Sequence, residues 1–435
     1  MTLLLPSLQA ERIRRSIVDY LSTTFALTDA EPRRVLTDFL EDEKQGVFVG
    51  PFVRLRLPYL AASARPGTTD PAHPADRPLD WDPGLTPYQH QEDSYRRLTT
   101  KGGHRPEPTI VTTGTGSGKT ESFLHPVLDH ALILSPMNAL AADQASRLAS
   151  LITGDPALAG VRAAIYTGDS SASPRKHVTA DSLITDRYVI RDNPPDILLT
   201  NYKMLDQLLL RPEDRELWRA SAGSLTYLVL DEFHTYDGAQ GTDVAMLLRR
   251  LGLTLRAHLS ADDPRQEAFA SAPLGPVCPV ATSATLGDGG DPSQMLAFAR
   301  DVFGTDLPTS AVVTETRADL DQWAATHRQV AESKGLTGRA LRLRSLPGEN
   351  LQALARLAEA GSPSPEELLR GVVAHLYDLP EEVEDTLDAA GLASALQAHP
   401  DVLDLVRAAE HSTSLADLAR GLLGPVPEPD LARRV

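Results

Sequence analysis

Short apolar runs separated by longer helical or irregular segments occupy the middle of the chain. Fully buried strands of a parallel sheet read as continuous apolar runs, and their alternation with helices is the pattern of βαβ units. We therefore predict an α/β fold, a P-loop-type parallel sheet with helices on both faces. Between about residues 85 and 305 the runs lie at Thr109–Thr112, Ala131–Leu134, Ala163–Tyr166, Ile197–Thr200, Tyr227–Leu230 and Val277–Thr282.

The flanking segments predict helices. Residues 7–43 repeat apolar positions near the helical period, and residues 50–60 alternate as a short strand does. Beyond residue 315 strand signals fade, and candidate helices cover 350–360, 365–377, 381–397, 401–410 and 414–423. We predict four regions: a helical N-terminal accessory region (1–61), a proline-rich linker (62–84), the α/β domain (85–314) and a mainly helical C-terminal region (315–435).

One junction inside the α/β domain leaves two alternatives. A helix after Lys119 can run to about His130, yet the next strand starts at Ala131 with no connecting residues. Connections of this kind usually take roughly 2–6 residues. Either the helix ends early, near Pro126, or a loop is missing.

Composition narrows the classes of protein. The single cysteine, Cys278, excludes an internal disulfide and a multi-cysteine zinc site. No apolar run is long enough for a membrane span, and Met1–Pro6 lacks the features of a secretory signal, so we expect a cytoplasmic protein. The net charge of −17 weakens a role in nucleic-acid binding without excluding it, because basic groups can cluster locally.

The strongest chemical signal is a glycine-rich loop from Thr113 to Thr120, directly after a predicted strand. Glycines let the backbone wrap phosphate oxygens, and the following helix turns its positive end toward the same charge. We expect Lys119 to reach the β- and γ-phosphates and Thr120 to bind Mg²⁺. The strict pattern has glycine where Thr113 stands, and an accidental Gly/Ser/Thr loop is the alternative. The residues expected to cradle ATP are Thr115, Gly116, Ser117, Gly118, Lys119 and Thr120.

An acidic motif follows the apolar run Tyr227–Leu230. Open parallel sheets bind ligands at the carboxyl ends of their strands, where this run delivers its acidic residues. Asp231 is suited to hold Mg²⁺, and Glu232 is suited to orient and deprotonate an attacking water. His234 is expected to contact another motif. We predict Lys119, Asp231, Glu232 and His234 as catalytic residues.

With these motifs the chain resembles the superfamily 2 DEAD/DEAH-box helicases. Asp231 to His234 resembles the DEAH form of motif II, and Thr282-Ser283-Ala284-Thr285 resembles the Ser-Ala-Thr motif III. The resemblance implies a first RecA-like domain that binds ATP and Mg²⁺. It also implies that the hydroxyls of Ser283 and Thr285 couple the ATP site to a nucleic-acid site.

Further segments extend the resemblance. Leu85 to Gln91 is similar to the adenine-reading Q motif, in which Gln89 and Gln91 compete and Gln91 is favoured. Other segments resemble the motifs that line the nucleic-acid groove, where hydroxyls, amides and backbone N–H groups touch the phosphate backbone. The implied nucleic-acid contacts are Pro136, Asn138, Gln144, Thr167, Gly168, Thr200 and Asn201.

The segment from Asp231 to Leu251 is similar to the large bacterial helicases related to YprA and MrfA, which include phage-defence relatives. The resemblance covers about residues 85–315. It implies DNA as the partner, either a single strand or a duplex with a single-stranded tail, and a role in repair or phage defence.

The arginine finger of such motors comes from a second RecA-like domain. Gly338 to Arg342 imitates part of the motif that carries it, but a basic turn is the favoured interpretation. We therefore expect the second domain to be supplied elsewhere, in a longer chain or by a partner subunit. The alternatives are a nucleotide-binding scaffold without independent hydrolysis and an unrelated P-loop ATPase.

Overall fold

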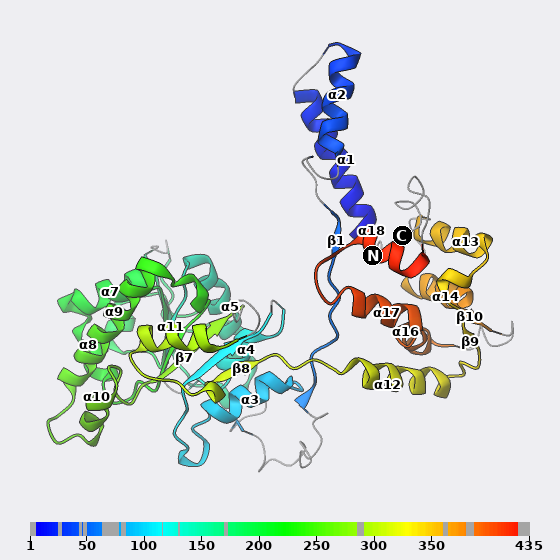
Figure 1. Cartoon of the computed structure of the whole chain (residues 1–435). Coiled ribbons are helices and arrows are strands. Elements are labelled where there is room, and N and C mark those ends of the chain that lie inside the picture. The colour runs from blue at the N-terminus through cyan, green and yellow to red at the C-terminus, as the bar shows by residue number, and fades with distance from the viewer. Residues whose placement is uncertain are drawn as a thin grey trace. The chain divides into compact units, whose positions relative to one another are not determined.

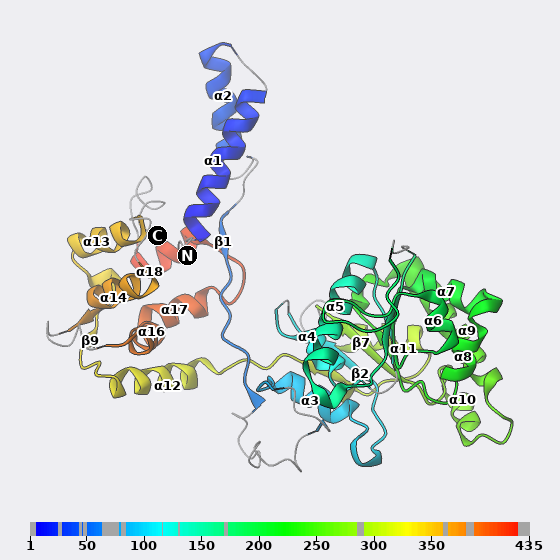
Figure 2. The same ribbon diagram turned by 180° about the vertical axis from the view of Figure 1, so that it is seen from behind.

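The chain folds into two compact units. One comprises Tyr59–Thr316, and the other comprises Met1–Pro58 together with Arg317–Val435. The computed structural model describes residues 6–24, 28–42, 46, 50–62, 78–79, 84–114, 116–128, 131–168, 173–284, 291–359, 364–379 and 387–424. Figure 1 and Figure 2 show the ribbon from opposite sides. Among the described residues, no helix is both long and apolar enough to cross a membrane.

A seven-stranded sheet forms the centre of the unit Tyr59–Thr316 (Figure 1). Its strand order is β4-β5-β3-β6-β7-β2-β8, and every neighbouring pair is parallel. The predicted α/β fold with a parallel sheet is confirmed. The strands are β2 (Thr109–Thr112), β3 (Ala131–Leu134), β4 (Ala163–Tyr166), β5 (Ile197–Thr200), β6 (Tyr227–Leu230), β7 (Cys278–Ser283) and β8 (Val312–Thr314).

Strands β2 to β6 have their predicted bounds, and β7 is shifted by one residue. Strand β8 was not predicted from the sequence. It is only three residues long and pairs on one side alone, with β2, so it has no long apolar run to reveal it. This edge strand nevertheless matters, because the residue after it reaches the glycine-rich loop.

Helices cover both faces of the sheet, as a parallel sheet requires. Successive strand residues point to opposite faces, so Leu228 and Leu230 join one hydrophobic core while Tyr227 and Val229 join the other. One face packs against α3 (Gln89–Leu98), α4 (Lys119–Leu124) and α5 (Asn138–Gly154). The other packs against α6 (Arg187–Asp192), α7 (Tyr202–Leu210), α8 (Arg215–Ser221), α9 (Gly238–His258) and α11 (Ser293–Phe303), with α10 (Ala268–Ser271) near the end of α9.

The junction between α4 and β3 follows the first alternative. Helix α4 ends at Leu124, well before β3 begins at Ala131. Pro126 has no N–H to continue the helical hydrogen bonds, so an early end is expected there. Residues 129–130, immediately before β3, lie outside the described residues.

The second unit is mainly helical. Four predicted helices beyond residue 348 are present near their predicted bounds. The helix predicted at 381–397 begins only at Ala389, and residues 380–386 lie outside the described residues. Helix α12 was not predicted. The core of the unit gathers residues such as Ala331, Val373, Leu376 and Leu392. The helices are α1 (Pro6–Thr24), α2 (Ala30–Glu41), α12 (Leu320–Ser333), α13 (Gly348–Glu359), α14 (Pro365–Leu376), α16 (Ala389–Gln397), α17 (Pro400–Ala408) and α18 (Leu415–Leu423). The short strands are β1 (Phe52–Val53), β9 (Arg339–Ala340), β10 (Tyr377–Asp378) and β11 (Thr413–Ser414).

The two ends of the chain belong to one unit, which differs from the predicted division into regions 1–61 and 315–435. Strand β1 pairs antiparallel with β11, placing Phe52 opposite Ser414. The backbone N–H of Leu55 also donates to the carbonyl of Ala409 at 2.8 Å. Pairing between segments so distant in sequence leaves no local pattern to detect. Most of the predicted linker 62–84 lies outside the described residues.

Arg342, the last residue of the segment that resembles the arginine-finger motif, has a structural role in this unit. Arg342 Nη1 lies 2.8 Å from Asp401 Oδ1 and 2.5 Å from Asp404 Oδ2. The hydrogen bonds that Arg342 donates, first the one to Asp401 and then the one to Asp404, raise the pKa of Arg342. Leu343 N–H donates to the other oxygen of Asp401 at 2.7 Å. This arrangement favours the interpretation of a basic turn.

We expect Arg342→Met to destabilise the helical unit and to leave ATP turnover unchanged. The buried Asp401 would lose its cation, but Arg342 is partly exposed, so the expected loss is only about 1 kcal/mol. Urea unfolding followed by circular dichroism measures the first effect and an ATPase assay the second. A folded variant whose turnover falls tenfold would instead identify Arg342 as a catalytic group.

Candidate nucleotide-binding site

The glycine-rich loop joins β2 to α4 in a conformation that its glycines permit. Gly116 and Gly118 have φ angles of +78° and +73°, in the left-handed region that favours glycine. A Cβ atom at Gly118 would also lie only 2.3 Å from Gln91 Nε2. The Ser117 hydroxyl donates to the Thr113 hydroxyl at 2.7 Å, so the threonine that replaces the usual first glycine closes the loop. Thr115 lies outside the described residues.

Helix α3 supports this loop with two side chains. Gln91 Nε2 donates to the Gly118 carbonyl at 3.1 Å, and its Oε1 accepts from the Tyr88 N–H at 2.8 Å. His90 Nε2 lies 2.9 Å from the Ser117 carbonyl, a contact that the sequence did not predict. Gln89 is buried and donates to Asp93 instead, at 2.9 Å. The structure thus brings Gln91, and not Gln89, to the glycine-rich loop.

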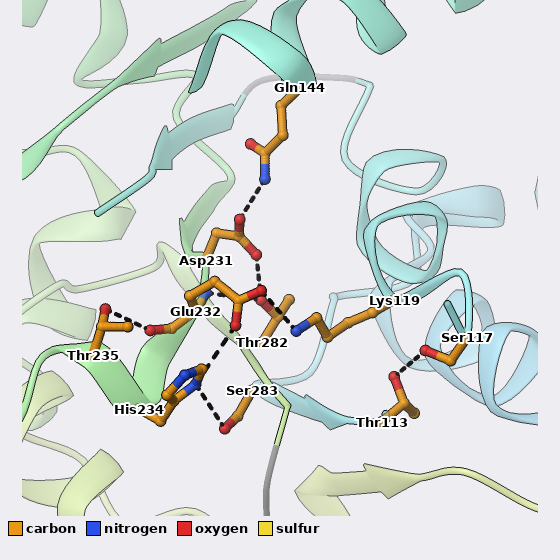
Figure 3. Close-up of polar contacts among 10 residues, drawn as sticks. All are labelled: Thr113, Ser117, Lys119, Gln144, Asp231, Glu232, His234, Thr235, Thr282 and Ser283. Carbon is orange, nitrogen blue, oxygen red and sulfur yellow. Dashed lines mark hydrogen bonds and ion pairs between the residues drawn. The ribbon is translucent and has the colours of Figure 1, made fainter. Parts of the chain in front are cut away.

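Motif II meets the loop at the carboxyl end of β6 (Figure 3). Glu232 Oε1 lies 3.0 Å from Lys119 Nζ. Glu232 has a φ of +50°, unusual for a residue with a side chain. Two threonines hold it there: its N–H donates to Thr282 Oγ1 at 3.1 Å, and Thr235 Oγ1 donates to its carbonyl at 2.7 Å. The backbone conformation of Glu232 and the charge of Lys119 therefore both hold the Glu232 carboxylate beside Lys119.

Asp231 is buried beside Glu232, and protein donors hold both of its carboxylate oxygens. Thr282 Oγ1 donates to Oδ1 and Gln144 Nε2 donates to Oδ2. Burial raises the pKa of Asp231, and the charge of Glu232 raises it further. The Thr282 hydrogen bond and Lys119 oppose the rise.

The residues at this edge fit a magnesium ion. Asp231 supplies a buried carboxylate, and Lys119, the cation nearby, is paired with Glu232. Thr120 follows in the first turn of α4 and supplies a hydroxyl oxygen. Mg²⁺ prefers such oxygen ligands and usually binds through one or two carboxylates plus substrate phosphates. Accordingly, no cluster of three or more His, Cys, Asp or Glu side chains suited to a metal occurs among the described residues.

Ser283, one of the two predicted coupling residues, meets motif II through His234. Its Nδ1 lies 3.4 Å from Ser283 Oγ and 3.5 Å from Glu232 Oε2. The Ser283 carbonyl also accepts from the Thr113 N–H at 3.2 Å. Ser283 therefore touches both motif II and the glycine-rich loop, while Thr285 lies outside the described residues.

Glu315 is a further residue at the loop that the sequence did not predict. It follows β8, and its Oε2 accepts the N–H of Gly114 at 2.8 Å. No motif marks it, because the contact depends on the pairing of β8 with β2.

A groove with a volume of about 480 Å³ opens on the same domain. Asn201 Nδ2 donates to Asn138 Oδ1 at 2.7 Å across it, and Asn201 Oδ1 caps α7 by accepting from the Met204 N–H. Four predicted nucleic-acid contacts line this groove: Pro136, Asn138, Gly168 and Asn201. The additional lining residues are Tyr202, Lys203, Met204, Gln207 and Gln240.

Three predicted nucleic-acid contacts do not line the groove. Thr200 is fully buried and donates to the Tyr166 carbonyl. Thr167 is half-buried, and its carbonyl accepts from Arg187 at 3.3 Å. Gln144 is buried and bonded to Asp231. The polar groups of Thr200 and Gln144 are therefore bonded within the protein, because polar residues next to a motif can equally turn inward.

Comparison with protein families matches residues 88–287 to the family described as DEAD/DEAH box helicase. These residues form a DEAD/DEAH-box helicase domain. The predicted resemblance is confirmed, and the motifs above are those of this helicase domain.

Curated relatives are similar over the same region. Druantia protein DruE of Escherichia coli is 26% identical over 333 residues, which cover 52% of this chain and 17% of DruE. The uncharacterized ATP-dependent helicase YprA of Bacillus subtilis is 31% identical over 172 residues, covering 38% of this chain and 20% of YprA. The chain thus spans less than a quarter of the length of the curated relatives that it matches.

Among solved structures, the DUF1998 helicase MrfA bound to DNA and AMPPNP has a TM-score of 0.41 and 22% sequence identity. The match covers 69% of this chain and 38% of that chain.

We expect Asp231→Asn to stabilise the nucleotide-free helicase domain at neutral pH, by about 0.5–2 kcal/mol, as relief of a strained functional site often does. The raised pKa means that the folded state binds the Asp231 proton more tightly than the unfolded state, so the charged carboxylate costs stability above that pKa. The difference between variant and parent should shrink as the pH falls through the raised pKa toward the ordinary carboxyl value. Thermal unfolding at several pH values measures it; an unchanged or lower midpoint at neutral pH contradicts the expectation.

Proposed function

We propose that this chain carries the ATP-binding motor domain of a DNA helicase or translocase that acts in DNA repair or phage defence. The observation that supports this most directly is the meeting of Lys119, Asp231 and Glu232 at the carboxyl edge of the sheet. A groove lined with amide side chains lies on the same domain.

In this proposal each group has one task in ATP binding and hydrolysis. The glycine-rich loop and Lys119 hold the phosphates, and Gln91 reads adenine. Thr120 and Asp231 hold magnesium, which neutralises phosphate charge when bound. In the structure, Lys119 pairs with Glu232. ATP offers Lys119 a phosphate partner, and Glu232 can then accept a proton from the attacking water.

Nucleic acid would lie in the groove that Asn138 and Asn201 line. Amides, backbone groups and small side chains contact a phosphate backbone without adding net charge. Lys203 adds a positive charge at the rim, because its side chain is exposed beside Tyr202. A groove of this kind suits one strand of DNA, and it reconciles nucleic-acid binding with a net charge of −17.

Full activity would require a second RecA-like domain, in a longer chain or a partner subunit. Hydrolysis by such motors depends strongly on an arginine finger. Arg342, which ends the segment that resembles the arginine-finger motif, donates hydrogen bonds to Asp401 and Asp404. We infer that the catalytic arginine comes from outside the described part of the chain.

A second candidate is a nucleotide-binding scaffold without independent hydrolysis. Two contacts favour slow turnover by this chain alone: the hydrogen bonds of Arg342 to Asp401 and Asp404, and the Lys119–Glu232 ion pair. Such a scaffold would bind ATP and a partner protein, and DNA would not accelerate hydrolysis even with a second RecA-like domain present.

Two variants should separate nucleotide binding from hydrolysis. Lys119→Ala removes the phosphate contact and should abolish ATP binding, whereas Glu232→Gln should retain binding and lower DNA-stimulated turnover by about 10²-fold or more. The assay measures ATP affinity and turnover with and without single-stranded DNA, in the presence of the second RecA-like domain. Asp143→Asn, on the exposed side of α5, serves as the control. Absence of DNA stimulation in the parent would favour the scaffold.

The salt dependence of DNA binding tests the groove. Loss of one phosphate contact in Lys203→Ala should reduce the slope of log affinity against log salt by about 0.7 for a single strand. Lys334→Ala removes the same charge from the helical unit, where Lys334 pairs with Asp388, and should leave the slope unchanged. Equal slopes in the parent and both variants would place the DNA elsewhere.

A further inference from the structure

Helix α5 connects the groove to the carboxylate of motif II. Its first residue, Asn138, lines the groove and accepts a hydrogen bond from Asn201. Gln144 lies on the same helix, about 9 Å further along at the usual rise of about 1.5 Å per residue. The first turns of one rigid element therefore touch the groove at one end and Asp231 at the other.

The Gln144 side chain is held in one orientation. Its Nε2 donates to Asp231 Oδ2 at 2.5 Å, and its Oε1 accepts from the Ser135 hydroxyl at 3.2 Å. The residue is only 5% exposed, so water does not compete for these bonds. Because Ser135 occupies the amide oxygen, the amide nitrogen must face the carboxylate, as Figure 3 shows.

The Asp231 carboxylate is fixed from two sides. Thr282, on β7, donates to one oxygen, and Gln144, on α5, donates to the other. Groups that hydrogen-bond a metal ligand orient it, and their loss typically costs about 10–100-fold in metal affinity or activity. Thr282 belongs to the recognised motif III, whereas Gln144 comes from a helix that begins at the groove.

We propose that Gln144 is a positioning residue that aims Asp231 at magnesium and transmits occupancy of the groove to that carboxylate. The proposal rests on the proposed function, since it takes Asp231 as a magnesium ligand. A strand bound at Asn138 shifts the first turns of α5 and with them the Gln144 amide. Coupling of this kind is reciprocal, so nucleic acid alters the affinity for magnesium–nucleotide and magnesium–nucleotide alters the affinity for nucleic acid.

The test compares the full chain with Gln144→Met, which keeps the size of the side chain and removes both hydrogen bonds. Binding of a fluorescent, non-hydrolysable ATP analogue is measured in EDTA and across a magnesium titration, so no catalytic turnover is needed. We expect affinity in EDTA to stay within about twofold of the parent and the half-saturating magnesium concentration to rise about tenfold. Asp143→Asn changes the adjacent, exposed residue of α5 and should match the parent.

The same titration with a saturating single-stranded DNA oligonucleotide tests the transmission. In the parent and in Asp143→Asn, DNA should shift the half-saturating magnesium concentration, and in Gln144→Met this shift should vanish. If Gln144→Met does not fold, Ser135→Ala is the substitute: it keeps the Gln144 side chain and removes the hydrogen bond that fixes its amide. We then expect a smaller rise in the half-saturating magnesium concentration and a smaller loss of the DNA-dependent shift.

Three outcomes overturn the proposal. Parent-like magnesium dependence in Gln144→Met removes the positioning role, and loss of DNA affinity with that dependence intact would make Gln144 a strand contact. No effect of DNA on the parent removes the transmission. A parent chain that binds no nucleotide at all would instead refute the proposed function, and the inference with it.

Discussion

The carboxyl ends of parallel strands must meet at one edge of a sheet, and the nucleotide site depends on this constraint. Strands β6, β7 and β2 are consecutive neighbours, so Asp231, Ser283 and Thr113 emerge side by side. Hydrogen bonds then lock the three loops together: the Glu232 N–H donates to Thr282, and the Thr113 N–H donates to the Ser283 carbonyl. The three loops are therefore joined to one another by hydrogen bonds, as the proposed coupling between them requires.

The sequence predicted the parts of the fold that have a local signature. Continuous apolar runs located β2 to β6, and the glycine-rich loop and acidic motif marked the nucleotide site. It could not predict Glu315 at the loop, because that contact depends on a three-residue edge strand. The burial of Gln144 against Asp231 was not predicted for a related reason. Its position on α5 looks polar and accessible until the buried partner, Asp231, is known.

Local charge around the groove differs from the bulk charge of the chain. The net charge is −17, yet amide side chains and one exposed lysine, Lys203, line the proposed nucleic-acid groove. At the nucleotide site negative charge predominates, because two adjacent carboxylates, Asp231 and Glu232, share Lys119 as their nearby cation. Burial makes the charged form of Asp231 unfavourable, and in the proposed function a bound divalent cation would offset that cost.

The pairing of β1 with β11 has a consequence for the order of folding during synthesis. The RecA-like unit is one uninterrupted stretch, Tyr59–Thr316, whereas the helical unit needs Phe52 and Ser414 to meet. Domains generally fold as units while the chain emerges from the ribosome. A nascent chain would thus complete the unit Tyr59–Thr316 while β1 is still an unpaired edge, until β11 has been translated.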